Sequence, residues 1–317
     1  MKKIVSLNLS LVLLLLCGCI QQENKDTQFL LNTVVTLTAS CDSKTLDGAF
    51  ALCQEYEQIL SRTVKSSDVY KLNNSNDFVE VSEHTANIIN RAVYYGNLSN
   101  GKFDITIYPL SSLWDFNNEI IPSRDEISEA LKNVDYQSIT FNENKVNLNE
   151  KQIDLGGIAK GYIADRVLEY FNQKNVSEGI IDLGGNIVVF GDRDYTVGIK
   201  KPFSDGKIAA TLKLRNKTVV TSGTYERYIL DDTTLYHHIL DPKTGFACDS
   251  DLSSATIISD SSIDADALST VCVLLGLDKA KEVIENTPNT EAVFIDNNNK
   301  LHYTSGLSLN NGQFTLK

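Results

Sequence analysis

Strands and helices do not alternate regularly along this chain, and this restricts the folds that it can adopt. Residues 33–38 have the β-branched alternation of a strand, and residues 46–60 have the apolar spacing of an amphipathic helix. Further helices are expected over residues 83–99 and from about Arg124 onward. A doubly wound parallel sheet requires strands and helices to alternate. We therefore predict an α+β fold, one large domain of two lobes with its ligand bound between them.

The part of the chain after residue 145 carries mainly strand signals. Two strands around a turn are expected at residues 145–148 and 151–155, and a helix at residues 161–172. Four later segments also have strand character: residues 179–190, 195–199, 209–214 and 218–221.

A glycine-rich segment, DLGGIAKG at residues 154–161, lies where the expected strand gives way to the helix. The first N–H groups of a helix can bind a phosphate, and Lys160 adds a positive charge. The segment has neither the GK[ST] of a Walker loop nor the glycine spacing of a dinucleotide fingerprint. A tight turn that needs glycine for packing is the alternative interpretation.

Asp266 and Thr270 are four residues apart in a segment of helical character, which puts both side chains on one face. Carboxylate and hydroxyl oxygens are hard ligands suited to Mg²⁺ or Ca²⁺. There are too few protein oxygens for a calcium cage, so Mg²⁺ completed by water and phosphate is expected. The alternative is that both are ordinary helix-surface residues.

His238 precedes a rigid turn, Asp241–Gly245, and is the candidate for a general base or a ligand-orienting group. A structural histidine is the alternative. Near residue 101, Phe103 could flank a flat ring and Asp104 could accept a hydrogen bond. The aromatic residues of the following segment, Trp114 and Phe116, could equally belong to the core.

The N-terminus has the pattern of an exported lipoprotein. A positive start is followed by an apolar run at residues 9–16, too short to span a bilayer. The run ends in LCGC, which resembles a lipobox with Cys19 as the acylated residue; a simple secretory signal is the alternative. We predict a signal peptide at residues 1–18, a lipidated tether at 19–28, and a location on the outer face of a bacterial cell membrane or in the periplasm.

Composition excludes one class of partner. The chain has 29 basic and 41 acidic side chains, a formal net charge of −12, and no basic stripe of the kind that binds nucleic acid. An acidic protein that handles a phosphorylated ligand needs local positive charge from a metal, a lysine or backbone N–H groups. A Cys41–Cys53 disulfide is possible in such a compartment, but no zinc-like cysteine spacing occurs.

Taken in order, these segments resemble the FAD:protein FMN transferase family, also called ApbE-like flavin transferases. Similarity extends over nearly the whole chain after the N-terminus, so residues 29–317 are expected to form the flavin transferase domain. The segments that carry the resemblance are GKFD at 101–104, DLGGIAKG at 154–161, HILDPKTG at 238–245, DALST at 266–270, the stretch from Leu60 to Asn73, DLGGN at 182–186 and TSGTYERY at 221–228.

The resemblance implies Mg²⁺-dependent transfer of FMN from FAD to a Ser or Thr hydroxyl of a partner protein, with release of AMP. It assigns the metal to Asp266, Thr270 and the carbonyl of Ala159, and catalysis to His238 and Lys160. Leu31-Asn32-Thr33 stands where the family usually has Met-Gly-Thr. The residues expected to contact the flavin nucleotide are Leu31, Asn32, Thr33, Phe103, Asp104, Gly156, Lys160, Tyr162, His238 and Ile239.

The expected partners are FAD, an acceptor protein bearing a Ser/Thr flavinylation motif, and a membrane reached through the lipid anchor. Two other functions are compatible with the same residues. Water in place of the acceptor would make the protein an FAD pyrophosphatase that yields FMN and AMP. A tethered flavin-binding lipoprotein without turnover is the other, although it would not require Asp266, Thr270 and His238.

Overall fold

The computed structural model describes residues 23–317. The predicted signal peptide, residues 1–18, and the predicted lipidation site Cys19 lie outside the described residues. Among the described helices, none combines the length and the apolar composition that crossing a bilayer requires.

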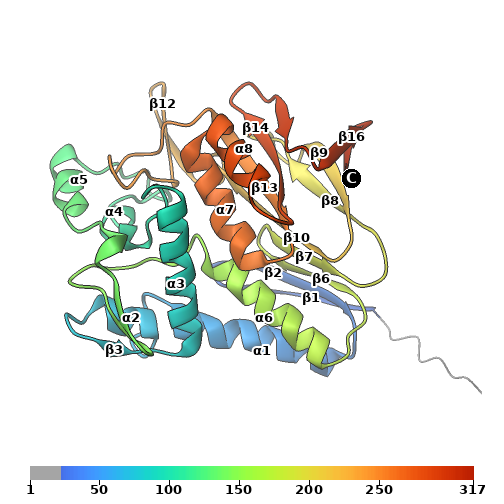
Figure 1. Cartoon of the computed structure of the whole chain (residues 1–317), viewed down its shortest axis with the longest axis horizontal. Helices are drawn as coiled ribbons and strands as arrows, with labels where there is room; N and C mark the ends of the chain where they lie inside the picture. Colours follow the sequence, from blue (N-terminus) through green and yellow to red (C-terminus); the bar gives the residue numbers. More distant parts are fainter. Residues whose placement is uncertain (1–22) are drawn as a thin grey trace, which may run out of the picture.

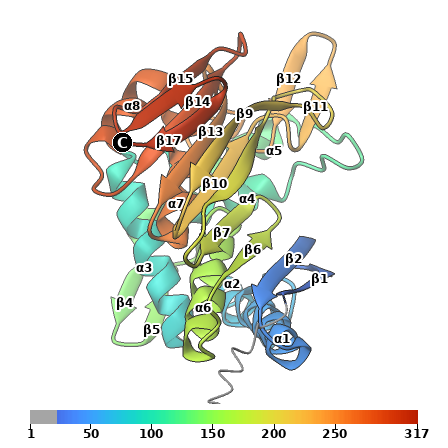
Figure 2. The same cartoon turned by 90° about the vertical axis from the view of Figure 1, so that its right-hand side faces the viewer.

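A large antiparallel sheet forms the centre of the molecule (Figures 1 and 2). Strand β13 is buried along its whole length because it is covered on both faces. In order across the sheet, the strands are β1 (Glu23–Leu30), β2 (Thr33–Ser40), β6 (Gly179–Leu183), β7 (Asn186–Phe190), β10 (Lys217–Gly223), β13 (Leu252–Ser259), β14 (Glu291–Asp296) and β15 (Leu301–Tyr303).

A second sheet packs on one face of the central sheet. Apolar side chains from the two sheets meet in a shared cluster, to which Val219 and Ile258 come from the central sheet and Leu212 and Phe314 from the second. The strands of the second sheet are, in order, β16 (Leu307–Asn310), β17 (Gln313–Leu316), β9 (Ile208–Leu214) and β8 (Tyr195–Lys200).

Helices cover the other face and enclose the main core. Helix α7 is surrounded by protein, which explains why its apolar residues show no single face: Ala267, Leu268, Val271 and Val273 are all fully buried. The helices of this layer are α1 (Ser43–Leu60), α3 (Glu83–Leu98), α6 (Ala159–Gln173), α7 (Ser262–Leu275) and α8 (Leu277–Glu285).

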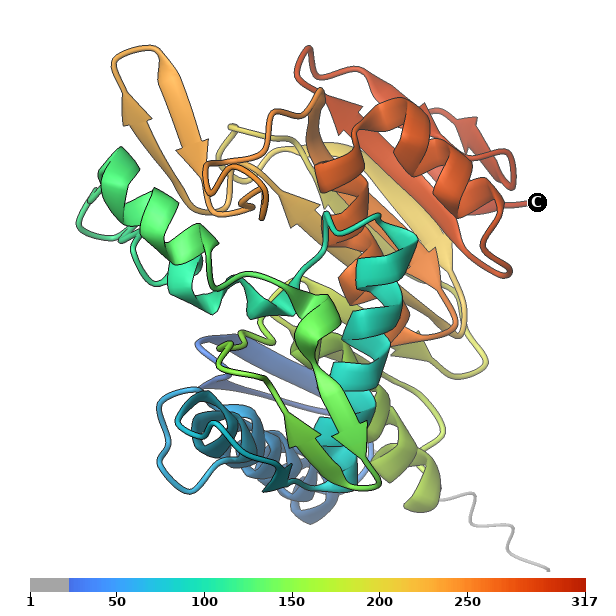
Figure 3. The same cartoon turned by 60° about the vertical axis from the view of Figure 1, so that its left-hand side comes forward.

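A smaller lobe lies beside α3 (Figures 1 and 3). The lobe has its own apolar cluster, which contains Leu110, Trp114 and Ile127. Ile229 and Leu240, from later in the chain, belong to the same cluster. Trp114 and the partly buried Phe116 are therefore core residues. The lobe and its neighbours comprise α2 (Asp68–Asn73), β3 (Val79–Glu80), η1 (Ile105–Ile107), α4 (Tyr108–Ser111), α5 (Arg124–Leu131), η2 (Tyr136–Ser138), β4 (Thr140–Asn142), β5 (Lys145–Asn147), β11 (Tyr228–Asp231) and β12 (Thr234–His237).

The α+β class is confirmed, as are most of the expected elements. The helix expected from about Arg124 begins at that residue, because Ser123 and Glu126 form a capping box. The expected strand over 179–190 is two strands, β6 and β7, joined by a turn at Gly184 and Gly185, both of which have positive φ. The cysteines of the described chain, Cys41, Cys53, Cys248 and Cys272, are buried free thiols, so Cys41 and Cys53 form no disulfide.

The expected strand at residues 151–155 is wrong. This segment belongs to no sheet in the described structure. Instead, the Asn73 side chain donates to the Ile153 carbonyl at 2.9 Å and accepts from the Ile153 N–H at 2.7 Å. One side-chain amide thus satisfies the backbone groups that a neighbouring strand would otherwise pair.

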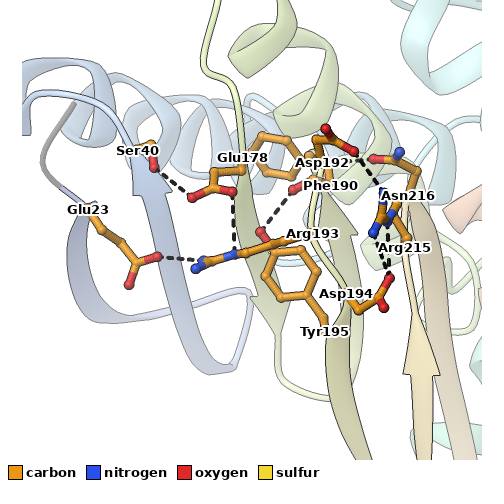
Figure 4. Close-up of polar contacts among 11 residues, drawn as sticks. Glu23, Ser40, Glu178, Phe190, Asp192, Arg193, Asp194, Tyr195, Arg215 and Asn216 are labelled. Carbon is orange, nitrogen blue, oxygen red and sulfur yellow. Dashed lines mark hydrogen bonds and ion pairs between the residues drawn. The ribbon is translucent and has the colours of Figure 1, made fainter. Parts of the chain in front are cut away.

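The expected tether over residues 19–28 also needs correction, because its part from Glu23 onward is strand β1. That strand pairs with β2 along its whole length. Figure 4 shows how its first residue is fixed: Arg193 donates to Glu23 at 2.6 Å and lies 3.5 Å from Glu178. A polar composition indicated a solvated linker, but an edge strand with little burial tolerates the same residues.

Candidate active site

The start of α6 lies directly against α7 at Gly161. The Gly161 N–H donates to the Asp266 carboxylate at 2.8 Å. A Cβ atom at position 161 would lie 2.7 Å from the Asp266 Cβ and even closer to the Ser262 carbonyl. Only glycine allows this approach of the two helices. The glycine-rich segment therefore fixes Asp266 relative to the first turn of α6.

The Asp266 side chain is almost fully buried, with 5% of its surface exposed. Oδ2 accepts from the Gly161 N–H, and no hydrogen bond to Oδ1 occurs within residues 23–317. Burial raises the pKa of Asp266, and the nearby positive charge of Lys160 opposes that rise. A carboxylate in this position gains from a cation placed at its second oxygen.

Thr270 lies one turn further along α7 and faces the glycine-rich segment at residues 154–161, which we call the glycine loop. Its hydroxyl is 3.2 Å from the Ser222 hydroxyl, which is also 2.7 Å from Ser269. A Cβ atom placed on Gly157 would lie 3.7 Å from the Thr270 hydroxyl and 3.3 Å from the Phe103 ring. The glycine loop, Phe103 and Thr270 therefore meet at one point.

Ala159 and Lys160 are the first residues of α6. Lys160 is half-buried, and within residues 23–317 it forms no ion pair. Its charge acts on the carboxylates of Asp266 and Glu226 and on the imidazole of His238. A half-buried lysine without a carboxylate partner at the start of a helix suits an anionic ligand.

His238 is half-buried at the end of β12. Its backbone N–H donates to the Arg227 carbonyl at 3.0 Å, and its Nδ1 lies 3.3 Å from the same oxygen. A carbonyl only accepts, so Nδ1 carries the proton and Nε2 is the free base. Burial, with a smaller effect from the charge of Arg227, lowers the pKa of His238 to about 4. The imidazole is therefore neutral at physiological pH.

The turn after His238 has the expected form. The Gly245 N–H donates to the Asp241 carbonyl at 2.8 Å, and Gly245 has a φ of +74°. Asp241 forms an ion pair with Lys102, and its carboxylate also accepts from the Lys243 N–H at 2.9 Å. The turn is thus tied to the segment that carries Phe103.

Asp104 serves the fold of its own loop. Its carboxylate accepts from the Thr106 N–H at 2.7 Å, from the Thr106 hydroxyl at 2.6 Å and from the Tyr136 N–H at 3.1 Å. Phe103 is buried, with its ring centroid 6.4 Å from that of Tyr95. The contact of Phe103 and Asp104 with a flavin stays a prediction; in this structure both side chains also have protein partners.

The remaining residues expected at the flavin site lie in several places. Leu31 and Asn32 have φ of +55° and +56° and form the turn between β1 and β2. Thr33 packs on Gly184, Ile239 is buried, and Gly156 is exposed.

Tyr162 belongs to an aromatic cluster between α1, α3 and α6. Its hydroxyl lies 2.6 Å from His84 Nδ1, and its ring centroid is 5.9 Å from that of Tyr56. Its neighbour Gly161 faces α7. Tyr162 therefore lies on a different face of α6 from the contact with Asp266.

Two residues that position the site, Ser222 and Arg62, were not predicted from the sequence. Ser222 lies within TSGTYERY but carried no signal that its hydroxyl contacts Thr270. Arg62 forms an ion pair with Asp154, whose other oxygen accepts from the Gly156 N–H at 2.9 Å. The only signal in the sequence for this ion pair was the acidic residue at the start of the glycine-rich segment.

The protein oxygen atoms expected to bind a metal near Asp266 suit a hard cation that takes its remaining ligands from water or substrate. Residues 23–317 contain no group of three or more His, Cys, Asp or Glu that could enclose a metal. One carboxylate oxygen without a partner, one hydroxyl and a backbone carbonyl leave several coordination positions for water and phosphate. Such a set would suit the Mg²⁺ expected from the sequence, completed by water and phosphate.

Comparison with known proteins identifies the family. Residues 31–294 match the model of the ApbE family. The chain is 34% identical to the FAD:protein FMN transferase of Klebsiella pneumoniae over 84% of this chain and 86% of that protein. For the enzyme of the same name from Treponema pallidum the identity is 31%, over 83% and 80%.

Solved structures agree with this result. The crystal structure of the ApbE protein from Thermotoga maritima superimposes with a TM-score of 0.82 at 31% identity, covering 90% of this chain and 97% of that one. The flavin transferase ApbE from Vibrio cholerae has the same fold, with a TM-score of 0.81 at 23% identity. The chain described here belongs to the ApbE family.

Proposed function

We propose that this protein transfers FMN from FAD to a Ser or Thr hydroxyl of a partner protein, in a Mg²⁺-dependent reaction that releases AMP. The observation that carries the proposal is the position of Lys160 at the start of α6: its charge acts on the buried Asp266 carboxylate, which accepts from the adjacent Gly161 N–H, and on the neutral His238 imidazole. The names of the relatives, FAD:protein FMN transferase, support the same reaction.

Asp266, Thr270 and the Ala159 carbonyl would hold the metal. A Mg²⁺ ion held there would neutralise the pyrophosphate of FAD and stabilise the charge that develops on the departing AMP. The second Asp266 oxygen would be the strongest ligand of the set, because it carries charge and accepts no hydrogen bond from residues 23–317.

Lys160 and the glycine loop bind and orient the pyrophosphate. The lysine charge and the N–H groups at the start of α6 supply positive potential that is fixed before the substrate arrives. The tie between Gly161 and Asp266 at 2.8 Å keeps the phosphate-binding turn in register with the metal-binding carboxylate. A site organised in advance loses little free energy to rearrangement during the reaction.

His238 receives the proton of the acceptor hydroxyl at Nε2. The hydroxyl oxygen then forms a new bond to the phosphorus of the FMN moiety. The bond from that phosphorus to the bridging oxygen breaks, and AMP leaves with the electron pair. A pKa of about 4 keeps the imidazole unprotonated before the reaction, so that it can accept this proton at neutral pH.

The proposal is tested by incubating the protein with FAD, Mg²⁺ and an acceptor domain that another FAD:protein FMN transferase is able to modify. The expected result is an acceptor heavier by one FMN, with no change in mass when EDTA is present. Free FMN and AMP with an unmodified acceptor would instead establish a pyrophosphatase. FAD that is bound but never cleaved would refute both reactions.

We also propose that Cys19 is lipidated and holds the enzyme at the extracytoplasmic face of the cell membrane. The basis is the apolar run at residues 9–16 followed by the LCGC sequence. Labelling of cells with a radioactive fatty acid tests it. The wild-type protein should incorporate label, and a Cys19→Ala variant should not; equal labelling of the two would refute the assignment.

A further inference from the structure

The hairpin formed by β11 and β12 stands out from the body of the molecule (Figures 1 and 3). Within residues 23–317 its two strands pair only with each other. Ile229 and Tyr236, which lie opposite each other, pack on the cluster that contains Trp114, with 5.5 Å between the ring centroids of Trp114 and Tyr236. This contact uses one face of the hairpin.

The other face of the hairpin is apolar apart from His237, which is buried. It carries Tyr228 opposite His237 and Leu230 opposite Leu235. Leu230 is 63% exposed and Tyr228 is 42% exposed. The solvated face of an antiparallel sheet is ordinarily polar. An apolar face on an isolated, projecting hairpin is therefore a surface suited to being covered.

The loop between β8 and β9 extends this surface. Phe203 is 50% exposed, and its ring centroid lies 5.5 Å from that of Tyr228 and 6.1 Å from that of Tyr225. The backbone of Phe203 has a φ of +50°, a conformation that bulky residues rarely adopt. The fold thus holds a large aromatic side chain outward beside Tyr228. We call Phe203, Tyr228, Leu230 and Leu235 the hairpin face.

The hairpin face is continuous with the candidate active site. Arg227 immediately precedes β11, and its carbonyl accepts the N–H of His238, which immediately follows β12. The base of the hairpin therefore fixes the imidazole that is assigned to the acceptor hydroxyl. The hairpin therefore borders the position that an acceptor hydroxyl has to reach at His238.

We propose that the hairpin face docks the acceptor protein, through an extended segment that carries an apolar side chain close to the modified hydroxyl. The proposal rests on the proposed FMN transfer and names the surface that selects its protein substrate. The apolar side chain would pack between Phe203 and Leu230. The exposed edges of the two-stranded sheet offer backbone groups to an extended segment, as in strand addition.

The test uses two substitutions on the hairpin face, Leu230→Asn and Phe203→Asn, because asparagine tolerates the left-handed backbone at position 203. Phe78→Asn is the matched control, since Phe78 is 45% exposed and is not part of the hairpin face. FMN transfer is measured against acceptor concentration, and FAD affinity is measured by flavin fluorescence. Binding of the acceptor without turnover is measured calorimetrically in an Asp266→Ala background.

Loss of an apolar interface anchor should raise the KM for the acceptor about tenfold in each variant. FAD affinity and the Phe78→Asn control should be unchanged. An unchanged KM in both variants overturns the proposal. So does a loss of FAD affinity that equals the loss of transfer, because the hairpin face would then belong to the nucleotide site.

Two further outcomes concern a second copy of this chain as the occupant of the hairpin face and a protein that transfers no FMN. Sedimentation that shows a dimer broken by Leu230→Asn, with an unchanged acceptor KM, would assign the face to a second copy of this chain and overturn the proposal. If the wild-type protein transfers no FMN, the proposed reaction fails, and calorimetry still decides docking. Acceptor binding weakened about tenfold by the two substitutions supports docking, and equal or absent binding overturns it.

Discussion

A Gly161→Ala substitution should both destabilise the fold and disable the site. The added Cβ would lie 2.7 Å from both the Asp266 Cβ and the Ile263 Cα, and closer still to the Ser262 carbonyl. These atoms belong to the backbone or the rigid stem of α7, so none can rotate away. Helices α6 and α7 must therefore move apart, which breaks the 2.8 Å hydrogen bond from Gly161 to Asp266.

The size of the effect follows from three terms. Overpacking in a close contact costs roughly 1–3 kcal/mol. Loss of a hydrogen bond to a charged group costs about 1.5–3 kcal/mol more. The greater helix propensity of alanine returns up to about 1 kcal/mol. We expect a net decrease of roughly 2–5 kcal/mol in the free energy of unfolding.

Urea unfolding of the purified protein measures this decrease, and FAD cleavage in the presence of Mg²⁺ measures the damage to the site. Gly48→Ala is the matched control, because a Cβ there meets only the phenol end of Tyr170, which can rotate aside. That variant should keep wild-type stability to within about 1 kcal/mol. A Gly161→Ala protein with wild-type stability and wild-type FAD cleavage would refute the reasoning.

Three further predictions concern neighbouring residues. The pKa of His238 is lowered from 6.5 to about 4, so the stability due to its neutral form is present above pH 6.5 and is lost as the pH falls toward 4. Transfer should accordingly stay constant from pH 8 to about 5, and an acidic limb with a midpoint near 6.5 in the pH–rate profile would contradict the assignment. Asn73→Ala leaves the buried N–H and carbonyl of Ile153 without partners. It should lower the free energy of unfolding, measured with urea, by about 2–4 kcal/mol. An unchanged unfolding midpoint would show that the Asn73 amide is not needed. Ser222→Ala removes the partner of the Thr270 hydroxyl and should raise the Mg²⁺ concentration for half-maximal FAD cleavage severalfold, whereas an unchanged Mg²⁺ dependence would exclude Ser222 from positioning Thr270.

Elements with strong local signals could be predicted from the sequence. The helix that carries Asp266 and Thr270 and the turn at Asp241–Gly245 are both determined by residues close in the chain. The segment 151–155 could not be predicted in the same way. Its backbone groups are paired by Asn73, a residue distant in sequence. Local patterns cannot distinguish a sheet partner from a side-chain partner.

The site shows the same division between local and distant information. The spacing of Asp266 and Thr270 indicated a hard-cation site on one helical face, and the structure brings both beside the glycine loop. The contact between Ser222 and Thr270 depends on how β10 lies against α7, which no local pattern encodes. The three hydrogen bonds accepted by Asp104 were likewise invisible in the sequence.

The central claim is that this site moves FMN from FAD to a protein hydroxyl with Asp266 as the metal-binding carboxylate. The most direct test follows acceptor mass and AMP release together for the wild-type protein and for Asp266→Asn, which preserves the volume of the buried side chain. We predict one AMP released per FMN attached by the wild-type protein, and no attachment by Asp266→Asn at any Mg²⁺ concentration. Acceptor modified by Asp266→Asn at the wild-type rate, or AMP released by the wild-type protein with the acceptor unmodified, would contradict the account.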